Sequence, residues 1–253
     1  MNKKLLAVII GVSALVVIII VLGVTFTIRN VTIGTTSTLT LSKEEENALV
    51  LDSGIVMKSS ILSVDEDTVI RNIENKHPTI KVISVERKFP NTVCINMSNR
   101  TPVYVIGMQD GTYAVLDREL KVVDIVDDYS NITYVTPIIG YTLSGAQKGG
   151  FLTGINFLSE ITSEAENLSF VNQRFSCYIP SIEYLKEDNN EVNKILLKTN
   201  TGVTLVIKEV PGSMGTFFNY AYTKYYNELT ENQRSTGYVY LTDDNVWTWS
   251  STL

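Results

Sequence analysis

The sequence predicts a single N-terminal transmembrane helix followed by an α+β ectodomain in which strands outnumber helices. Three observations lead to this fold class: a long apolar run near the N-terminus, two helix-like segments set among strands before residue 100, and many short alternating segments after residue 102. A chain of 253 residues is long enough for two domains, because a domain averages roughly 150 residues.

The apolar run predicts a membrane anchor. No charged residue occurs from Leu5 to Ile28. About 20 helical residues match the roughly 30 Å thickness of the hydrocarbon core of a bilayer. The hydrophobic region of a cleaved signal peptide is shorter, about 7–15 residues, and precedes a small-residue cleavage site that GVTFTIRN does not offer. We expect a cytoplasmic tail over residues 1–4 and a retained transmembrane helix over residues 5–27.

The charges around this helix predict its orientation. Lys3 and Lys4 precede the apolar run and only Arg29 follows closely, so the N-terminus should stay inside and residues 29–253 should face outward. Removing the two lysines from the 21 basic residues leaves 19 against 27 acidic ones, a net charge of −8. Such an acidic domain argues against nucleic-acid binding and against contact with anionic lipid.

Two helices are expected in the membrane-proximal part. Ser42 and Glu45 form a capping-box pattern, which predicts a helix over residues 42–50. A second helix should begin at Ser63 or Asp65 and end near Lys76, just before Pro78.

Three strands are expected around these helices, at 28–34, 80–89 and 92–98, the last two joined by the turn KFPN. The apolar alternation slips at Val82 and Ile83. This slip predicts a β-bulge or a strand that is covered on both faces.

The remainder of the chain predicts a sheet with a few helices. The expected strands are VYVIG (103–107), TYAVLD (112–117), KVVDIV (121–126), ITYV (132–135), 174–185, 193–199 and 203–209. The expected helices cover 154–165 and 214–229.

No catalytic, metal-binding or cofactor-binding residue is predicted, and no small-molecule substrate. His77 is the only histidine, so a catalytic triad or a multi-histidine metal site cannot form. The carboxylates at 65–67, 127–128 and 243–244 lack the spacing of a Ca²⁺ loop, and helix caps and turns explain them. Cys94 and Cys177 fall in different predicted domains, so two free thiols are favoured over a bridge.

The order of a membrane span, a strand, two helices, two strands and a β-rich remainder resembles the FtsQ/DivIB family of bacterial cell-division proteins. The residues that carry the likeness are Pro78 and Ile80, Val85, Arg87, Phe89 and Pro90, Thr92 and Ile95, Arg100, Pro102 and Val103, and YAVLD at 113–117. Lys58 is a departure, because the family often has glycine there.

The resemblance implies a POTRA domain over residues 28–101 and a β domain over residues 102–253. It implies a non-catalytic membrane scaffold located at the division septum. Its partners would be the FtsL-type and FtsB/DivIC-type single-span division proteins, and it would regulate septal peptidoglycan synthesis. Two other functions stay open: a membrane-anchored cell-wall enzyme, and a POTRA module of a secretion or assembly system.

The C-terminal segment YVYLTDDNVWTW predicts a hairpin with four aromatic side chains. Tyr238 and Tyr240 share one face of its first strand, and Trp247 and Trp249 share one face of its second. A turn of two or four residues would place all four together, whereas a three-residue turn would separate the pairs. An even turn is feasible without glycine, because Asp and Asn tolerate the left-handed conformation.

Two interpretations of this hairpin stay open on the residues alone. The aromatic side chains could pack within the sheet, or they could flank an open edge that accepts a partner's strand. Residues 246–253 contain neither charge nor proline to block such an edge. The family resemblance favours the open edge, although Tyr240 stands where the family has Asp. We therefore predict partner binding by Tyr238, Tyr240, Thr242, Trp247 and Trp249.

Overall fold

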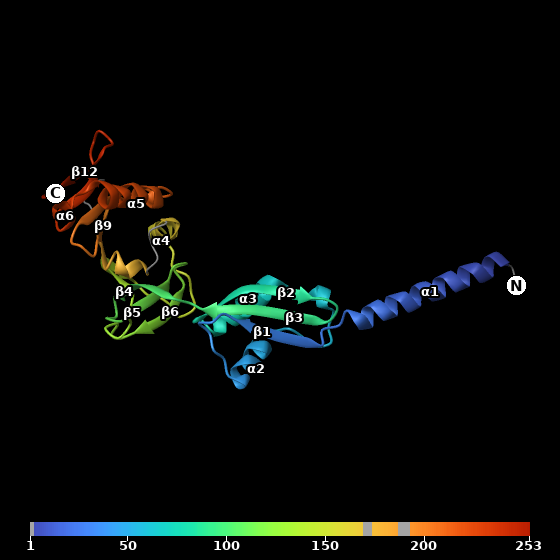
Figure 1. Ribbon diagram of the computed structural model, residues 1–253. Helices are drawn as coiled ribbons and strands as arrows, with labels where there is room; N and C mark the ends of the chain where they lie inside the picture. The colour runs from blue at the N-terminus through green and yellow to red at the C-terminus, as the bar shows by residue number, and fades with distance from the viewer. Residues whose placement is uncertain (1–2, 169–173, 187–192) are drawn as a thin grey trace. The chain divides into compact units, whose positions relative to one another are not determined.

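The computed structural model describes residues 3–168, 174–186 and 193–253, with the side chains of its first helix described from Gly11 onward except at Leu22. The chain divides into two compact units, Met1–Asn99 and Arg100–Leu253 (Figure 1). Each unit has its own cluster of buried apolar side chains. The two are therefore described separately.

The first helix, α1 (Lys3–Thr25), covers the apolar run. Within the described residues, no helix is long and apolar enough to cross a membrane. The side chains of α1 are described at residues 11–21 and 23–25, and each of these stretches is shorter than the roughly 20 residues that a span requires. The transmembrane helix expected over residues 5–27 stays a prediction.

The rest of the first unit has the predicted strand, helix, helix, strand, strand order. Its elements are β1 (Asn30–Thr35), α2 (Lys43–Asp52), the short 3-10 helix η1 (Ile61–Ser63), α3 (Glu66–Lys76), β2 (Ile80–Lys88) and β3 (Thr92–Asn99). The sheet order is β1-β3-β2, with β1 parallel and β2 antiparallel to β3. The mixed pairing follows from the connections, because a short turn joins β2 to β3 whereas helices separate β1 from them.

Local sequence signals account for the ends of these elements. The backbone N–H of Ser42 donates to Glu45 Oε2 at 2.8 Å, and the N–H of Glu45 donates to Ser42 Oγ at 3.2 Å, which is the predicted capping box. Asp65 is the N-cap residue of α3. The register of β2 shifts between Val82 and Ser84, so the bulge is the correct one of the two interpretations there.

The predicted motif residues of the first unit have distinct structural roles. Val85 and Ile95 are buried in its core. Arg87 donates to the carbonyl oxygen of Val64 at 2.8 Å, which ties β2 to the start of α3. Lys58 has φ 67°, a conformation that glycine adopts at less cost.

In its described residues, the second unit has a nine-stranded mixed sheet and three α-helices. Its strands are β4 (Pro102–Met108), β5 (Tyr113–Asp117), β6 (Val122–Val126), β7 (Thr136–Leu143), β8 (Ser181–Leu185), β9 (Lys194–Lys198), β10 (Thr204–Lys208), β11 (Tyr238–Leu241) and β12 (Trp247–Ser250). Its helices are α4 (Phe157–Asn167), α5 (Met214–Thr223) continued by a π-helical turn η3 (Lys224–Glu228), α6 (Glu231–Arg234), and the 3-10 helix η2 (Phe175–Cys177). The strand order is β12-β11-β10-β9-β8-β7-β4-β5-β6.

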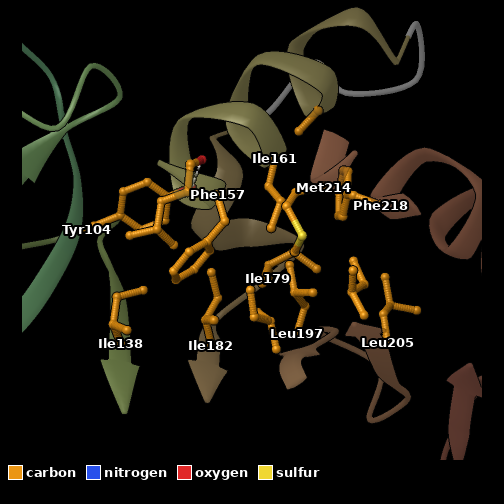
Figure 2. Packing of buried hydrophobic residues seen from close by; sticks show 14 of the residues in the cluster. Tyr104, Ile138, Phe157, Ile161, Ile179, Ile182, Leu197, Leu205, Met214 and Phe218 are labelled. Carbon is orange, nitrogen blue, oxygen red and sulfur yellow. Dashed lines mark hydrogen bonds between the residues drawn. The ribbon is translucent and has the colours of Figure 1, made fainter. Parts of the chain in front are cut away.

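The core of this unit lies between one face of the sheet and the helices α4 and α5. Figure 2 shows Ile138, Ile182, Leu197 and Leu205 pointing from the strands toward Phe157, Ile161, Met214 and Phe218. Tyr104 is fully buried there, and its hydroxyl donates to the carbonyl oxygen of Leu158 at 3.1 Å, so its polar atom is satisfied. Burial raises the pKa of Tyr104 well above its usual range.

Three predicted elements differ from the structure. Residues 132–135 form a turn rather than a strand, because Tyr134 has φ 65° and the strand begins only at Thr136. Of the strand expected over 174–185, only Ser181–Leu185 is extended. The helix expected from residue 154 begins at Phe157, because Gly154 has φ 86°, which is not a helical value.

A buried ion pair holds the start of the second unit. Arg100 pairs with Asp117 and with Glu119, the latter at 2.9 Å, and the side chains of Arg100 and Asp117 are only 2% and 5% exposed. Asp117 Oδ1 also accepts the backbone N–H of Lys121 at 2.9 Å. The sequence motif of the POTRA domain includes Arg100 and Pro102. In the structure both residues lie in the second unit, where Arg100 makes this ion pair and Pro102 lies opposite Asp117 of β5.

We expect Asp117→Ala to lower the free energy of unfolding of the second unit by about 3–5 kcal/mol, because it leaves the buried Arg100 guanidinium without its buried partner. Glu119→Ala is the matched control, since its carboxylate contacts the same guanidinium but is 39% exposed and should cost at most about 1 kcal/mol. Urea unfolding of both variants measures the difference. Equal losses would contradict the importance of the buried pair.

We also expect Gly140→Ala to destabilise the second unit more than Gly111→Ala. Both glycines have positive φ, 77° and 88°, so each alanine carries a penalty of about 1–2 kcal/mol. At Gly140 a Cβ would also lie 2.3 Å from the carbonyl oxygen of Tyr184 on β8, whereas nothing lies within 4 Å at Gly111. Thermal unfolding of the two variants checks this, and a larger loss at Gly111 would refute it.

Candidate functional site

The candidate site is the open edge of the second unit's sheet at β12. This strand is last in the sheet order and pairs with β11. No segment among the described residues pairs with its outer side. The opposite edge strand, β6, is partly covered, because Val122 exchanges backbone hydrogen bonds of 2.8 Å with Gly149 and Gly150. An uncovered edge with unpaired backbone groups is a template for strand addition.

The turn between β11 and β12 has an odd number of residues. The backbone N–H of Thr242 donates to the carbonyl oxygen of Val246 at 3.0 Å, which leaves residues 243–245 as a three-residue loop. Asn245 has φ 59°, the left-handed conformation that such loops need at their last position. Of the two turn parities that the sequence allowed, the structure has the odd one.

The odd number of loop residues places the four aromatic side chains on two different faces. The arrangement in which all four lie together is therefore wrong. Val239 lies opposite Trp249, and Leu241 lies opposite Trp247. Tyr238 and Tyr240 lie opposite Ser250 and Thr248. Directly opposite residues of an antiparallel pair point to the same face. The two tryptophans therefore share one face, and the two tyrosines share the other.

The tryptophan face is packed on the core. Val239 is fully buried, and Trp247 and Trp249 pack against the same cluster. The ring of Trp247 meets Phe217 of α5 edge-on, with centroids 6.3 Å apart, and Trp249 Nε1 donates to the carbonyl oxygen of Thr236 at 3.1 Å. These contacts make the tryptophans anchors of the hairpin.

A hollow of about 260 Å³ lies beside this anchored face. Its apolar lining includes Val210, Phe217, Leu241 and Trp247. Lys208 and Asp243 provide charged groups at the same hollow. It has room for one large side chain next to Trp247, the first residue of β12.

The tyrosine face has a different character. Tyr238 and Tyr240 are half-buried and lie beside Thr204 and Val206 of β10 in register. Thr242 follows on the same face by alternation, and its hydroxyl donates to the carbonyl oxygen of Val246 at 3.1 Å. Of the five predicted residues, Thr242 thus has a role in closing the turn.

The register also identifies which backbone groups face outward from the edge. Hydrogen-bonded pairs in an antiparallel ladder recur at every second residue. Because Thr242 bonds to Val246, the next such pairs are Tyr240 with Thr248 and Tyr238 with Ser250. The backbone N–H and C=O groups of Trp247 and Trp249 therefore point away from β11, toward the open side.

Gly237 and Phe217 are two residues of this site that the sequence analysis missed. Gly237 has φ 101°, and a Cβ there would lie 2.6 Å from the carbonyl oxygen of Ser250 and 2.8 Å from Trp249 Nε1. The glycine directly before a strand was a usable signal. Nothing in the sequence linked Phe217 to Trp247, since the contact joins a helix to a distant strand.

Several of the polar groups considered for chemistry have structural partners. His77 Nε2 lies 2.8 Å from Asp52 Oδ2, so this histidine is paired with a carboxylate. A hydrogen bond from Lys76 and, with a smaller effect, one from His77 lower the pKa of Asp52. Asp65 and Asp128 bond to Thr68 and Ser130. Over the described ranges, no group of three or more His, Cys, Asp or Glu side chains is placed to hold a metal ion.

Comparison with known proteins covers part of the chain. Residues 26–100 match the family model of the POTRA domain of FtsQ type. The chain is also 29% identical over 151 residues to the cell division protein FtsQ of Corynebacterium glutamicum. The predicted resemblance to the FtsQ/DivIB family is confirmed. The alignment with the Corynebacterium FtsQ covers 59% of this chain and 62% of that protein, which is less than two thirds of its length.

We expect Trp247→Ala to destabilise the second unit more than Tyr240→Ala. The Trp247 ring contacts Phe217 and the core, and removing a half-buried tryptophan should cost about 2 kcal/mol, below the 3–5 kcal/mol of a fully buried one. Tyr240 lies on the other face and should cost at most about 1 kcal/mol. Urea unfolding compares the two, and the reverse order would contradict the assignment of faces.

Proposed function

We propose that this protein is a non-catalytic membrane scaffold of the bacterial division machinery. In this proposal its second unit binds a single-span division protein of the FtsB/DivIC type by strand addition at β12, together with an FtsL-type protein. The complex would then regulate septal peptidoglycan synthesis. The observation that carries the proposal is the uncovered β12 edge in a chain that resembles FtsQ.

The geometry of the hairpin supports strand addition over a contact through aromatic side chains alone. The tryptophans are fixed on the core, so their outward backbone groups are held in an extended, pre-organised line. A partner strand would pair first with Trp247 and Trp249 through main-chain hydrogen bonds. Pre-organisation reduces the entropy that binding must offset.

The two faces of the hairpin suggest what the partner strand contains. Its side chains would alternate, so those on the tryptophan side would meet the hollow lined by Phe217 and Trp247. Those on the other side would lie beside Tyr238, Tyr240 and Thr248. We therefore propose a partner strand with an apolar or aromatic residue on the first side and polar residues on the second.

The proposed anchor is the apolar segment of α1, with the N-terminus in the cytoplasm and the rest of the chain outside. It rests on the length of the uncharged run and on the lysines before it. An anchor of this kind would confine both partners to one membrane plane, which raises their effective concentration. Location at the septum would then follow from the partners.

We expect Trp249→Pro to abolish capture of the FtsB/DivIC-type protein of the same organism by the full-length chain. Proline removes the outward N–H of residue 249, which in this register does not bond to β11. Trp249→Val is the matched control, because it loses the same ring but keeps the N–H and a strand-forming side chain. Co-purification from membranes measures capture, and thermal unfolding confirms that both variants fold.

If the valine variant captures the partner and the proline variant does not, the edge pairs through its backbone. Unchanged capture by both variants would place the partner elsewhere on the chain. Loss with both would assign the contact to the Trp249 ring rather than to strand addition.

A further inference from the structure

Four exposed apolar side chains of the first unit, called the patch below, lie on segments that contact the residues after α1. They are Val56, Met57, Leu62 and Phe89, with exposed fractions of 68%, 45%, 66% and 58%. Single exposed apolar residues are common on protein surfaces. A group of them around one structural point needs a separate explanation.

That point is the segment that directly follows α1. The helix ends at Thr25, and the carbonyl oxygen of Phe26 accepts the N–H of Ile61 at 2.8 Å. The carbonyl oxygen of Ile28 accepts the N–H of Lys58 at 2.9 Å, so the loop that carries Met57 runs beside the same segment.

Phe89 reaches this place from the turn between β2 and β3. Its ring meets that of Phe26 edge-on, with centroids 5.7 Å apart. The backbone N–H of Arg29 donates to the carbonyl oxygen of Asn91 at 2.8 Å, which ties the same turn to the chain after α1. The four side chains thus come from two segments, residues 56–62 and the turn at Phe89, and both segments contact the residues that follow the apolar helix.

Basic side chains accompany the patch. Arg29, Lys58 and Lys88 are exposed and belong to these two segments and to the residues that follow the helix. Glu86 is the acidic group closest in the chain to Lys88, and the two lie 4.0 Å apart. Apolar side chains with Lys and Arg at their margin have the chemistry of a surface that enters the headgroup region of a bilayer.

We propose that this patch binds the bilayer surface, with Leu62 and Phe89 inserted among the acyl chains and Lys58 and Lys88 at anionic phosphate groups. The inference rests on the proposed anchor, because α1 ends at Thr25, directly before the segment that the patch surrounds. The patch adds a second, peripheral attachment that holds the first unit against the membrane.

The test uses the full-length chain reconstituted in vesicles of phosphatidylcholine and phosphatidylglycerol whose acyl chains carry bromine, a quencher of tryptophan fluorescence. Phe89→Trp and Leu62→Trp report on the patch, and either suffices if the other does not fold. Ile83→Trp is the matched control, since Ile83 is 55% exposed on the same unit but lies five strand residues from Lys88, about 17 Å away. The unaltered chain gives the background of Trp247 and Trp249.

We expect quenching at positions 62 and 89 several-fold above that at position 83, and a reduction when Lys58→Gln and Lys88→Gln are added. Equal, low quenching at all three positions, in vesicles that retain the protein, overturns the inference and assigns the patch to another protein segment. If the unaltered chain does not float with the vesicles, the anchor itself fails and the inference fails with it. These two results are distinct, so the anchor is judged separately from the patch.

Discussion

Coverage of one face of the nine-stranded sheet by α4 and α5 is the constraint on which the second unit depends. The apolar side chains on this face, such as Ile106, Leu197 and Leu205, turn toward these helices, and alternation gives each strand only one register that achieves this. Each connection between strands must therefore have a length that keeps the apolar side chains of the next strand on this face. The irregularity in β7, where the register with β4 shifts between Ile106 and Gly107, and the positive φ at Gly140 are local departures that keep this arrangement.

The same constraint shapes the candidate binding edge. Val239 has to face the core, and the three-residue loop then places both tryptophans on the core side as well. The anchored tryptophans leave their backbone groups facing outward. The hairpin is therefore stiff where a partner strand would pair, and its tyrosine face is left for contacts that select among partners.

The first unit is held together in a different way from the second. Its core is closed by a few apolar side chains from each element, and caps such as Ser42 and ties such as Arg87 set where the helices start. The residues that remain exposed near Phe26 do not contribute to this core. The acidic net charge of the ectodomain predicts little affinity for anionic lipid. Net charge is a sum over the whole surface, however, and the surface around Lys58 and Lys88 is locally basic.

Signals that act over a few residues could be predicted from the sequence alone. The capping box at Ser42, the bulge at Val82, the order of elements in the first unit and the family resemblance all depend on neighbouring residues and spacing. The contacts that join distant segments could not be predicted. Examples are the Arg100 to Asp117 ion pair and the packing of Trp247 on Phe217.

The clearest case is the final hairpin. The sequence determined that residues 238–249 contain two aromatic strands and a turn without proline, and it allowed either turn parity. Packing against the core selects the odd loop, because this loop turns Val239, Trp247 and Trp249 together onto the core under α5. Burial of these side chains on one face outweighs the gain from grouping four aromatic rings, since each buried apolar side chain contributes about 1.5–3 kcal/mol and each cross-strand pair about 0.2–1 kcal/mol.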